Sequence, residues 1–339
     1  MMGARPPLVG VTPDPAVHDL LDEVVDASVH LPTTIWGFGI GGFLHALLRA
    51  GVARRRPELV DVVRERVVPA LSRPGGPSDH LIPVDALLAL STVDPSVDVG
   101  PTCERWTAAV TGAWRPVPNS PRVHRPDLDR WHTAIWVDCM HTDGPGLARL
   151  GHLRAAVTAA EEYSAALQRN DGLFQHGYDV VAGMGNGVAW GRGQAWAMQG
   201  LIETLEQTSS SRLAERLEDQ LSALARHEDD GRWHTVVDDP RSPIENSVAA
   251  YAAWLVPHAI RVVVDPAHAA MAFRARESTT RALVNGVLPT SDATPVGRPI
   301  DYYSRPVGAH PWGQAPVLHH LLDRLSMAAL DDSSRKGHP

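Results

Sequence analysis

Asp138 lies in the most suggestive surroundings of any ionisable residue in the sequence. Trp136, Val137 and Met140 are close to it in the chain, so its neighbourhood is largely apolar. Removal of a carboxyl group from water favours its protonated form, and such a group can donate a proton near neutral pH. Asp138 could instead cap a helix that begins just after it. The local sequence alone leaves both roles open.

A histidine between aromatic residues marks a second segment. In the run DGLFQHGYD at residues 171–179, His176 lies between Phe174 and Tyr178. An imidazole can donate, accept or exchange a proton near neutral pH. A single histidine beside aromatic rings is, however, more often structural, and this segment alone favours that role.

The third segment is WGRGQAW at residues 190–196, with Arg192 between two glycines. Glycine on both sides would let a ligand approach the backbone closely. Arg192 and Trp196 are four residues apart and would share one face of a helix. A guanidinium can pair with a carboxylate through two hydrogen bonds while an indole stacks on a ring, so together they could hold a sugar acid. Arg192 could instead pair with a buried aspartate.

Most of the chain is predicted to be helical, and the helices are of two kinds. The first kind is amphipathic, with one apolar and one charged face. Its members are Ala16–Val29, Pro57–Leu71, His152–Gln168 and Ser211–His227. The second kind is rich in small or aromatic residues and has few charges, which predicts helices enclosed by protein. Its members are Ile35–Ala50, Trp190–Leu205, Pro243–Val256 and Pro311–Leu325.

Solvent-exposed helices therefore alternate with enclosed ones, and strand signals are weak. The best of them predicts a short extended stretch at Gly231–Val237. Such alternation predicts an all-α fold, either a closed double ring of helical hairpins or an open helical solenoid. In a closed ring the inner helices converge on a central cavity, and loops at one end carry the function. We expect a single domain over residues 14–330, with flexible ends at 1–13 and 331–339.

Composition excludes several classes of function. The 339 residues carry a net charge of −8, which argues against a general nucleic-acid-binding protein. Cys103 and Cys139 are too few for a disulfide framework or a structural zinc site. No apolar run approaches the roughly 20 residues that span a bilayer, and prolines interrupt the N-terminal segment, so we expect a cytoplasmic protein without a membrane partner. Aromatic residues make up only 6%, few for a site that stacks on sugars.

The motifs are more specific in combination than singly. WVDxxxxxGPxLARLG is followed by DGLFxHGYD and then by WGRGxxWxxxGLIETLE. GRWHTVVDDPRSPIE (231–245), YYSRP (302–306) and GQAP (313–316) come later. In order and wording these runs resemble glycoside hydrolase families 105 and 88, the unsaturated rhamnogalacturonyl and glucuronyl hydrolases. The resemblance covers most of the chain.

The resemblance implies an (α/α)6 barrel of six helical hairpins and a mechanism unlike that of ordinary glycosidases. The substrate would be an oligosaccharide left by a polysaccharide lyase, with a C4=C5 enol ether in the uronic acid at its non-reducing end. A carboxylic acid protonates C4, water adds at C5, and the resulting hemiketal opens and expels the rest of the chain. One residue can serve both proton transfers, and no metal or organic cofactor is needed. The expected partner is this small-molecule substrate, and the chain would be a monomer or a homodimer.

The resemblance also assigns roles by motif position. Asp138 matches the general acid and base. Asp79, in SDHLIP, matches a second active-site aspartate, and the two carboxyl groups could share one proton. His176 would hydrogen-bond the sugar or the water. The remaining matches to substrate-binding residues are Arg192, Trp196 and Trp36.

The segment after Asp138 departs from the family pattern WVDDLYMAxPFLA. Cys139 stands for an aspartate, Gly146 for a phenylalanine and His141 for an aromatic residue, and we expect His141 to contact the substrate. The pocket could therefore accept a different unsaturated sugar acid. It could also use the same acid for proton-initiated isomerisation, hydration or cyclisation of a non-carbohydrate substrate. A non-catalytic binding protein is a third hypothesis, disfavoured because such a protein needs no desolvated acid.

Overall fold

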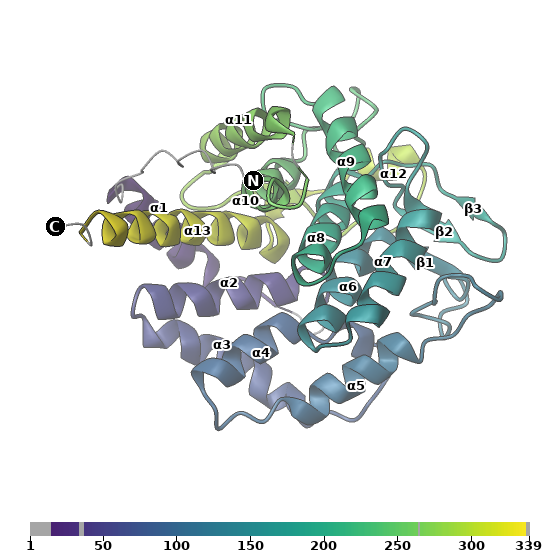
Figure 1. Ribbon diagram of the computed structural model, residues 1–339, viewed down its shortest axis with the longest axis horizontal. Coiled ribbons are helices and arrows are strands. Elements are labelled where there is room, and N and C mark those ends of the chain that lie inside the picture. The colour runs from purple at the N-terminus through teal and green to yellow at the C-terminus, as the bar shows by residue number, and fades with distance from the viewer. Residues whose placement is uncertain (1–14, 34–36, 264, 337–339) are drawn as a thin grey trace, which may run out of the picture.

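The helices of the protein form two concentric rings in a computed structural model that describes residues 15–33, 37–263 and 265–336 (Figure 1). The inner ring comprises α2 (Ile40–Ala53), α4 (Val84–Val93), α6 (Met140–Arg149), α8 (Gly191–Gln207), α10 (Asn246–Ala259) and α13 (Pro311–Lys336). The outer ring comprises α1 (Pro15–Ser28), α3 (Pro57–Leu71), α5 (Gly100–Thr111), α7 (Leu153–Leu167), α9 (Ser211–Arg226) and α11 (Pro266–Ala282). Each inner helix contacts the next, and α13 closes the ring against α2. The fold is therefore an (α/α)6 barrel and not an open solenoid.

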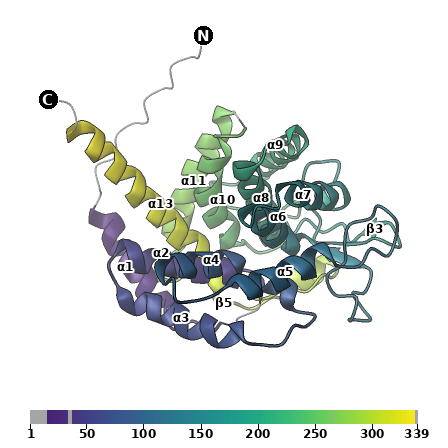
Figure 2. The same cartoon turned by 60° about the horizontal axis from the view of Figure 1, so that its bottom comes forward.

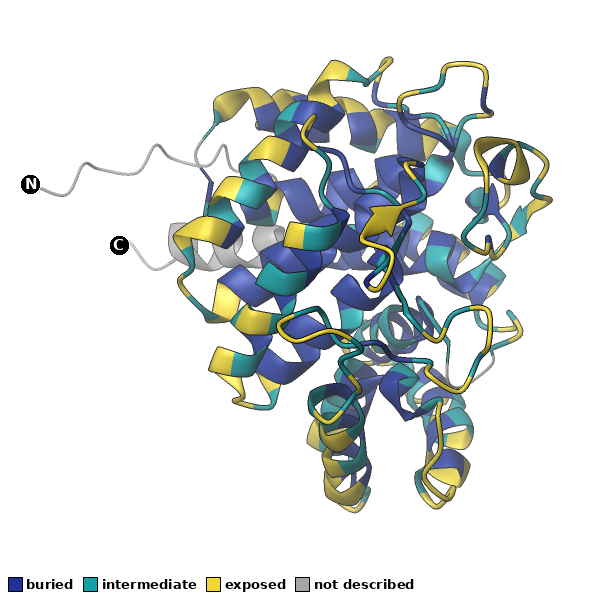
Figure 3. Cartoon of the chain, turned by 90° about the vertical axis from the view of Figure 1, so that its right-hand side faces the viewer, coloured by how far each residue is buried: buried dark blue, intermediate teal, exposed yellow. Residues whose placement is uncertain are grey.

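Burial separates the two rings, as Figure 3 shows. In α8, every residue from Gly191 to Leu205 is buried. In α9, only one face is buried, and it includes Leu213, Leu217 and Leu221. A helix surrounded by protein has no face on which charged residues stay hydrated. The enclosed and solvent-exposed helices predicted from the sequence are therefore the inner and outer rings.

Helix α6 was considered only as the helix that Asp138 could cap, because Gly144, Pro145 and Gly146 lie within it and both residue types disfavour helices. The structure shows what the glycines allow. A Cβ on Gly144 would lie 2.4 Å from Thr204 Oγ1 of α8, and a Cβ on Gly146 would lie 2.5 Å from the Trp106 ring. Close packing of neighbouring helices therefore outweighs low helix propensity here. The helices α4, α5 and α11 were also not predicted.

Gly200→Ala is expected to lower the free energy of unfolding by about 1–3 kcal/mol. The added Cβ would lie 2.2 Å from the Met140 carbonyl oxygen, and a backbone atom inside the barrel cannot move aside easily. Gly42→Ala in α2 is a matched control, because its Cβ would meet only Ala315, at 3.9 Å. This control should gain up to about 1 kcal/mol from higher helix propensity. Equal losses for both variants in chemical denaturation would contradict the packing argument.

Two small antiparallel sheets precede inner helices, and the hairpin that carries β3 projects from the body (Figure 2). β1 (Ala134–Trp136) pairs with β2 (Gly177–Asp179), and β2 pairs with β3 (Met184–Gly185). β4 (Pro289–Ser291) pairs with β5 (Val307–Ala309), and the short helix α12 (Pro299–Tyr303) lies between them in sequence. None of these strands was predicted, because two or three residues are too few to show alternation. The stretch Gly231–Val237 forms only isolated bridges, such as Val236 with Trp190.

The last helix is longer than expected. α13 runs to Lys336, beyond the flexible end that the sequence suggested from residue 331. The expected flexible N-terminus lies outside the described residues. No helix within the described ranges is long and apolar enough to cross a membrane.

Charged side chains occupy the end of the ring at which α8 and α10 finish. His258 near the end of α10 lies 2.9 Å from Asp323 of α13 and 3.1 Å from Glu206 of α8. Hydrogen bonds to Asp323 and then to Glu206 raise the pKa of His258 to about 9. The bonds join three neighbouring inner helices, so this charge contributes to closure of the ring.

Stability is expected to fall as the pH rises through about 9, the pKa of His258 in the folded protein. That value is above the roughly 6.5 of an unfolded histidine, so the contribution is complete below about pH 6.5 and is lost above the folded-state value. Thermal unfolding across this window measures the loss. His258→Gln should flatten this part of the profile, and an unchanged slope in that variant would assign the effect to other groups.

Candidate functional site

A cavity of about 810 Å³ opens where the inner helices begin. Ile40 and Pro311, the first residues of α2 and α13, line it. Five of the tryptophans that the structure describes also line it, namely Trp131, Trp136, Trp190, Trp196 and Trp312. These are half of the ten tryptophans in the sequence. The low aromatic content therefore does not limit stacking here, because the fold gathers the rings in one place.

Asp138 lines this cavity and is only 7% exposed. It lies in a short 3-10 helix (Val137–Cys139) between β1 and α6. Within the described residues, no side-chain hydrogen bond caps the start of α6. The helix-cap interpretation of Asp138 is therefore wrong, and its carboxylate is available to the cavity.

Strand pairing brings the acid to its histidine. Antiparallel β1 and β2 set Trp136 opposite Gly177, and the Val137 N–H donates to the His176 carbonyl at 2.9 Å. Since Asp138 comes just after β1 and His176 just before β2, their side chains meet. Asp138 Oδ2 and His176 Nε2 are 3.0 Å apart.

Protein groups hold both ring nitrogens of His176. Nδ1 lies 2.7 Å from the Tyr302 hydroxyl, and Nε2 faces Asp138. The ring stacks on Trp190 with centroids 4.2 Å apart. His176 therefore positions the acid, whereas the sequence had suggested a hydrogen bond to the sugar or the water.

His141 lies behind the acid and not on the cavity wall. Its Nδ1 donates to the Asp138 carbonyl oxygen at 2.5 Å, and its Nε2 accepts from the Gly39 N–H at 3.2 Å. The ring stacks on Trp196 at 4.8 Å, and burial lowers the pKa of His141. The expected substrate contact is therefore wrong. His141 joins the acid segment to the start of α2.

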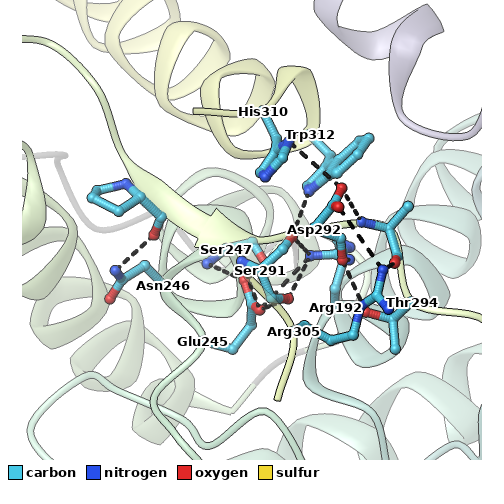
Figure 4. Close-up of polar contacts among 12 residues, drawn as sticks. Arg192, Glu245, Asn246, Ser247, Ser291, Asp292, Thr294, Arg305, His310 and Trp312 are labelled. Carbon is cyan, nitrogen blue, oxygen red and sulfur yellow. Dashed lines mark hydrogen bonds and ion pairs between the residues drawn. The ribbon is translucent and has the colours of Figure 1, made fainter. Parts of the chain in front are cut away.

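Arg192 is a buried residue of the cavity wall, and Figure 4 shows its contacts with Ser291 and Asp292. Its Nη1 donates to the Ser291 carbonyl oxygen at 2.8 Å, and its Nη2 donates to the Asp292 carbonyl oxygen at 2.9 Å. The guanidinium lies over the rings of Trp190 and Trp312, at 4.5 and 5.1 Å from their centroids. Arg192 therefore anchors the end of β4. Fewer of its N–H groups remain for a substrate carboxylate than the sequence suggested.

Glu245, just ahead of α10, supplies the counter-charge. Its Oε2 lies 3.7 Å from Arg192 Nη1 and accepts from the Ser291 N–H and hydroxyl. Its Oε1 accepts from the Ser247 N–H and hydroxyl at 3.2 and 2.6 Å. The alternative of an arginine paired with a buried acid thus holds, with a glutamate in place of the aspartate considered. Its only signal in the sequence was the last residue of the run 231–245.

The glycines beside Arg192 accommodate protein and not a ligand. A Cβ on Gly191 would lie 2.9 Å from the His234 carbonyl oxygen, and a Cβ on Gly193 would lie 2.7 Å from Val137 Cγ1. Trp196 does reach the cavity, one helical turn after Arg192, and its Nε1 donates to the Tyr251 hydroxyl at 3.3 Å. Trp196 thus lines the cavity, and its role in binding the substrate stays a prediction.

Asp79 does not join Asp138. Its Oδ2 accepts from the Gly76 N–H at 3.2 Å and lies 3.7 Å from Arg105 Nε. Among the described residues that line the cavity Asp79 is absent, whereas the next residue, His80, is present. The Gly75–Gly76 turn draws the carboxylate away, so the shared proton expected from the resemblance has no structural basis. Trp36, the expected stacking wall, lies outside the described residues.

Asp79→Asn is expected to change kcat by less than about tenfold and to lower the free energy of unfolding by about 1 kcal/mol or less. The reason is that its partner Arg105 is a partly exposed residue outside the cavity. Steady-state kinetics and urea unfolding measure both quantities. A loss of kcat comparable with that of an Asp138 variant would restore Asp79 to the mechanism.

Sequence reasoning missed His80 as a wall residue. Its Nδ1 donates to the Pro77 carbonyl oxygen at 2.9 Å. Burial lowers the pKa of His80 to about 4, so the ring is neutral at pH 7. Asp143, five residues after the acid, is fully buried and pairs with His124 Nε2 at 2.7 Å. It therefore supports the fold behind the cavity.

One group of metal-ligand side chains occurs within the described residues, at Glu218, Asp265 and His268. It lies between α9 and the start of α11, and none of its members lines the cavity. His268 Nε2 is 3.3 Å from Glu218, and Asp265 accepts from the Ala267 N–H at 2.8 Å. These side chains thus already have protein partners.

Comparison with known proteins decides the family. The family model of glycosyl hydrolase family 88 matches residues 117–328. The chain belongs to glycosyl hydrolase family 88. The family 88 match includes Asp138, His176 and Arg192. It also includes Glu245 and Tyr302.

This family 88 protein is similar to a curated relative in sequence and to solved structures in fold. An 85-residue stretch is 40% identical to the unsaturated rhamnogalacturonyl hydrolase YesR of Bacillus subtilis, and it spans 23% of this chain and 25% of that relative. A possible member of family 105 from Salmonella enterica has a TM-score of 0.78 at 20% identity, over 95% of this chain and 96% of that one. The unsaturated glucuronyl hydrolase of Bacillus sp. GL1 has a TM-score of 0.66 at 17% identity, over 91% and 96%. At these identities the solved structures show a shared fold.

Proposed function

We propose that this family 88 protein hydrates the C4=C5 enol ether of an unsaturated uronic acid at the non-reducing end of an oligosaccharide. The observation that carries the proposal is a single buried carboxyl group, Asp138, held by His176 at 3.0 Å in a cavity walled by tryptophans. A carboxyl group beside the substrate can donate a proton to an electron-rich alkene. Relatives named as unsaturated rhamnogalacturonyl and glucuronyl hydrolases support the substrate class.

The proposed reaction needs one proton donor. Asp138 gives its proton to C4, and the positive charge develops at C5 beside the ring oxygen. Water adds at C5 and returns a proton to the Asp138 carboxylate. The product is a hemiketal, which opens and releases the remaining sugar. Because one carboxyl group serves both transfers, the carboxylate spacing of ordinary glycosidases does not apply.

Charge in the cavity favours a substrate with few anionic groups. Arg192 is balanced by Glu245, and Arg125 forms two hydrogen bonds with Asp127, at 2.9 and 2.8 Å. Both guanidinium groups that line the cavity are therefore largely neutralised. A uronate joined to an uncharged sugar suits this cavity better than a sulfated chain. A volume of about 810 Å³ is large enough for such a small saccharide.

Loss of the ultraviolet absorbance of the enol ether tests the proposal. The panel comprises unsaturated galacturonyl and glucuronyl disaccharides, the latter with and without sulfate. We expect turnover of the unsulfated compounds and a lower kcat/KM for the sulfated ones. A stable absorbance with every sugar would overturn the proposal.

A non-sugar enol ether belongs in the same panel. The reason to include it is that Arg192 already donates to the Ser291 and Asp292 carbonyl oxygens, which leaves fewer of its N–H groups for a substrate carboxylate. Turnover of that compound alone would favour proton-initiated chemistry on a non-carbohydrate substrate.

A further inference from the structure

We infer that Tyr302 and Asn186 fix the tautomer of His176, and that the proton delivered by Asp138 is thereby carried on Oδ1. The catalytic part of this inference rests on the proposed function. The tautomer itself follows from the hydrogen bonds of Asn186 and Tyr302, in which each donor group has only one direction available. It can be measured without any substrate.

The first step is the orientation of Asn186. Its side-chain oxygen accepts from two backbone N–H groups, those of Gly177 at 3.2 Å and Val188 at 3.4 Å. Backbone N–H groups can only donate, so the oxygen of Asn186 must face them. The NH₂ group therefore faces the other way, toward the Gly297 carbonyl oxygen at 3.0 Å and the Tyr302 hydroxyl at 3.2 Å.

The second step is the direction of the Tyr302 proton. The phenolic oxygen accepts from the Asn186 NH₂ and, at 3.3 Å, from the Gly297 N–H. Both neighbours are donors, so the hydroxyl's own proton must point to the remaining partner, His176 Nδ1, at 2.7 Å. Burial raises the pKa of Tyr302 above its usual value, which keeps this proton in place.

The third step is the tautomer. His176 Nδ1 accepts from Tyr302, so the proton of the neutral ring is on Nε2. That N–H donates to Asp138 Oδ2 at 3.0 Å. Stacking on Trp190 holds the ring in this plane. In the acid form of this carboxyl group the carbonyl oxygen is the better acceptor, so Oδ2 takes the bond from His176 and the proton to be delivered is on Oδ1.

This arrangement has a consequence for catalysis. When Asp138 loses its proton, the bond from His176 becomes charge-assisted and stronger, which stabilises the carboxylate left behind. His176 donates throughout and does not itself take up the substrate proton. Tyr302 and Asn186 are therefore positioning residues, since they act on the acid only through the imidazole.

Tyr302→Phe tests the inference. It removes the hydrogen bond to Nδ1, so the Nδ1 resonance should move to that of a bare nitrogen without a donor, while Nε2 keeps its proton and its acceptor, Asp138 Oδ2. Imidazole ¹⁵N chemical shifts, assigned by comparison with His176→Gln, report the tautomer directly. In the unmodified protein we expect protonated Nε2 and bare Nδ1. Turnover should fall about 10- to 100-fold in kcat with little change in KM, and the acid limb of the pH profile should move.

Tyr303→Phe is the matched control. Its hydroxyl donates to Asp239 and has no part in the His176 network. This variant should leave the ¹⁵N shifts and kcat unchanged. Asn186→Asp provides a second route if Tyr302→Phe fails to fold, because a carboxylate in place of the NH₂ group would draw the Tyr302 proton away from His176.

The outcomes separate the inference from the proposed function. An Nδ1–H tautomer in the unmodified protein would overturn the inference, whatever the activity. A moved Nδ1 resonance in Tyr302→Phe with unchanged kcat would overturn the positioning role. The expected tautomer together with no turnover of any unsaturated sugar would support the network and reject the proposed function.

Discussion

Asp138→Asn is expected to lower kcat on an unsaturated disaccharide by about 10²- to 10⁴-fold, the usual contribution of a general acid. The amide has no proton of suitable acidity for C4, and it cannot recover one from water. The side-chain oxygen remains, so the His176 Nε2–H keeps an acceptor at the position of Oδ2, 3.0 Å away in the unmodified protein. The fold should therefore persist. The rate at which the enol-ether absorbance is lost at saturating substrate gives kcat.

The control for this result is the same chemical change at Asp79, whose partners are Gly76 and Arg105 outside the cavity. Both variants should unfold near the temperature of the unmodified protein. Retention of full activity by Asp138→Asn would remove Asp138 from the mechanism. Loss of activity together with loss of fold would point to a structural role for the carboxylate.

Glu245→Ala is expected to lower the free energy of unfolding by about 3–5 kcal/mol. The carboxylate is 1% exposed and accepts hydrogen bonds from Ser247 and Ser291 while it balances Arg192. Its removal leaves a guanidinium buried without a counter-charge and loosens β4 at the cavity wall. Urea unfolding measures the loss, and activity should fall with it because Asp292 and the loop after it lose their anchor.

A double-mutant cycle checks the cause. Arg192→Leu combined with Glu245→Leu removes both charges, and buried pairs replaced in this way often cost little. The double variant should therefore be more stable than the sum of the two single losses predicts. Strict additivity would show that Glu245 acts through the serine hydrogen bonds and not through Arg192.

Much of the architecture could be predicted from residue patterns. Helices with a leucine face, such as Ser211–His227, and helices with few charges, such as Trp190–Leu205, alternate in the order that becomes the outer and inner rings. The strands could not be predicted, because β1 and β2 have three residues each. Yet their pairing is what sets Asp138 beside His176.

The site shows the same division. Asp138, His176 and Arg192 were identified from their local sequence and its family resemblance, and the structure brings all three to one cavity. Asp79 was assigned to a proton-sharing pair with Asp138 and His141 to the substrate, and each instead bonds to nearby protein groups. Tertiary contacts decided these cases, since a polar side chain takes whichever partner the fold presents.

The sequence by itself determined the order and burial class of the helices with a clear pattern, and it identified Asp138 as the acid with apolar neighbours, because helical periodicity and local polarity are properties of neighbouring residues. The tertiary structure alone decided what each polar group does. His176 meets Tyr302 across 126 positions of sequence, and Arg192 meets Ser291 across 99. Hydrogen-bond partners so far apart are chosen by the closure of the barrel, which no local pattern records.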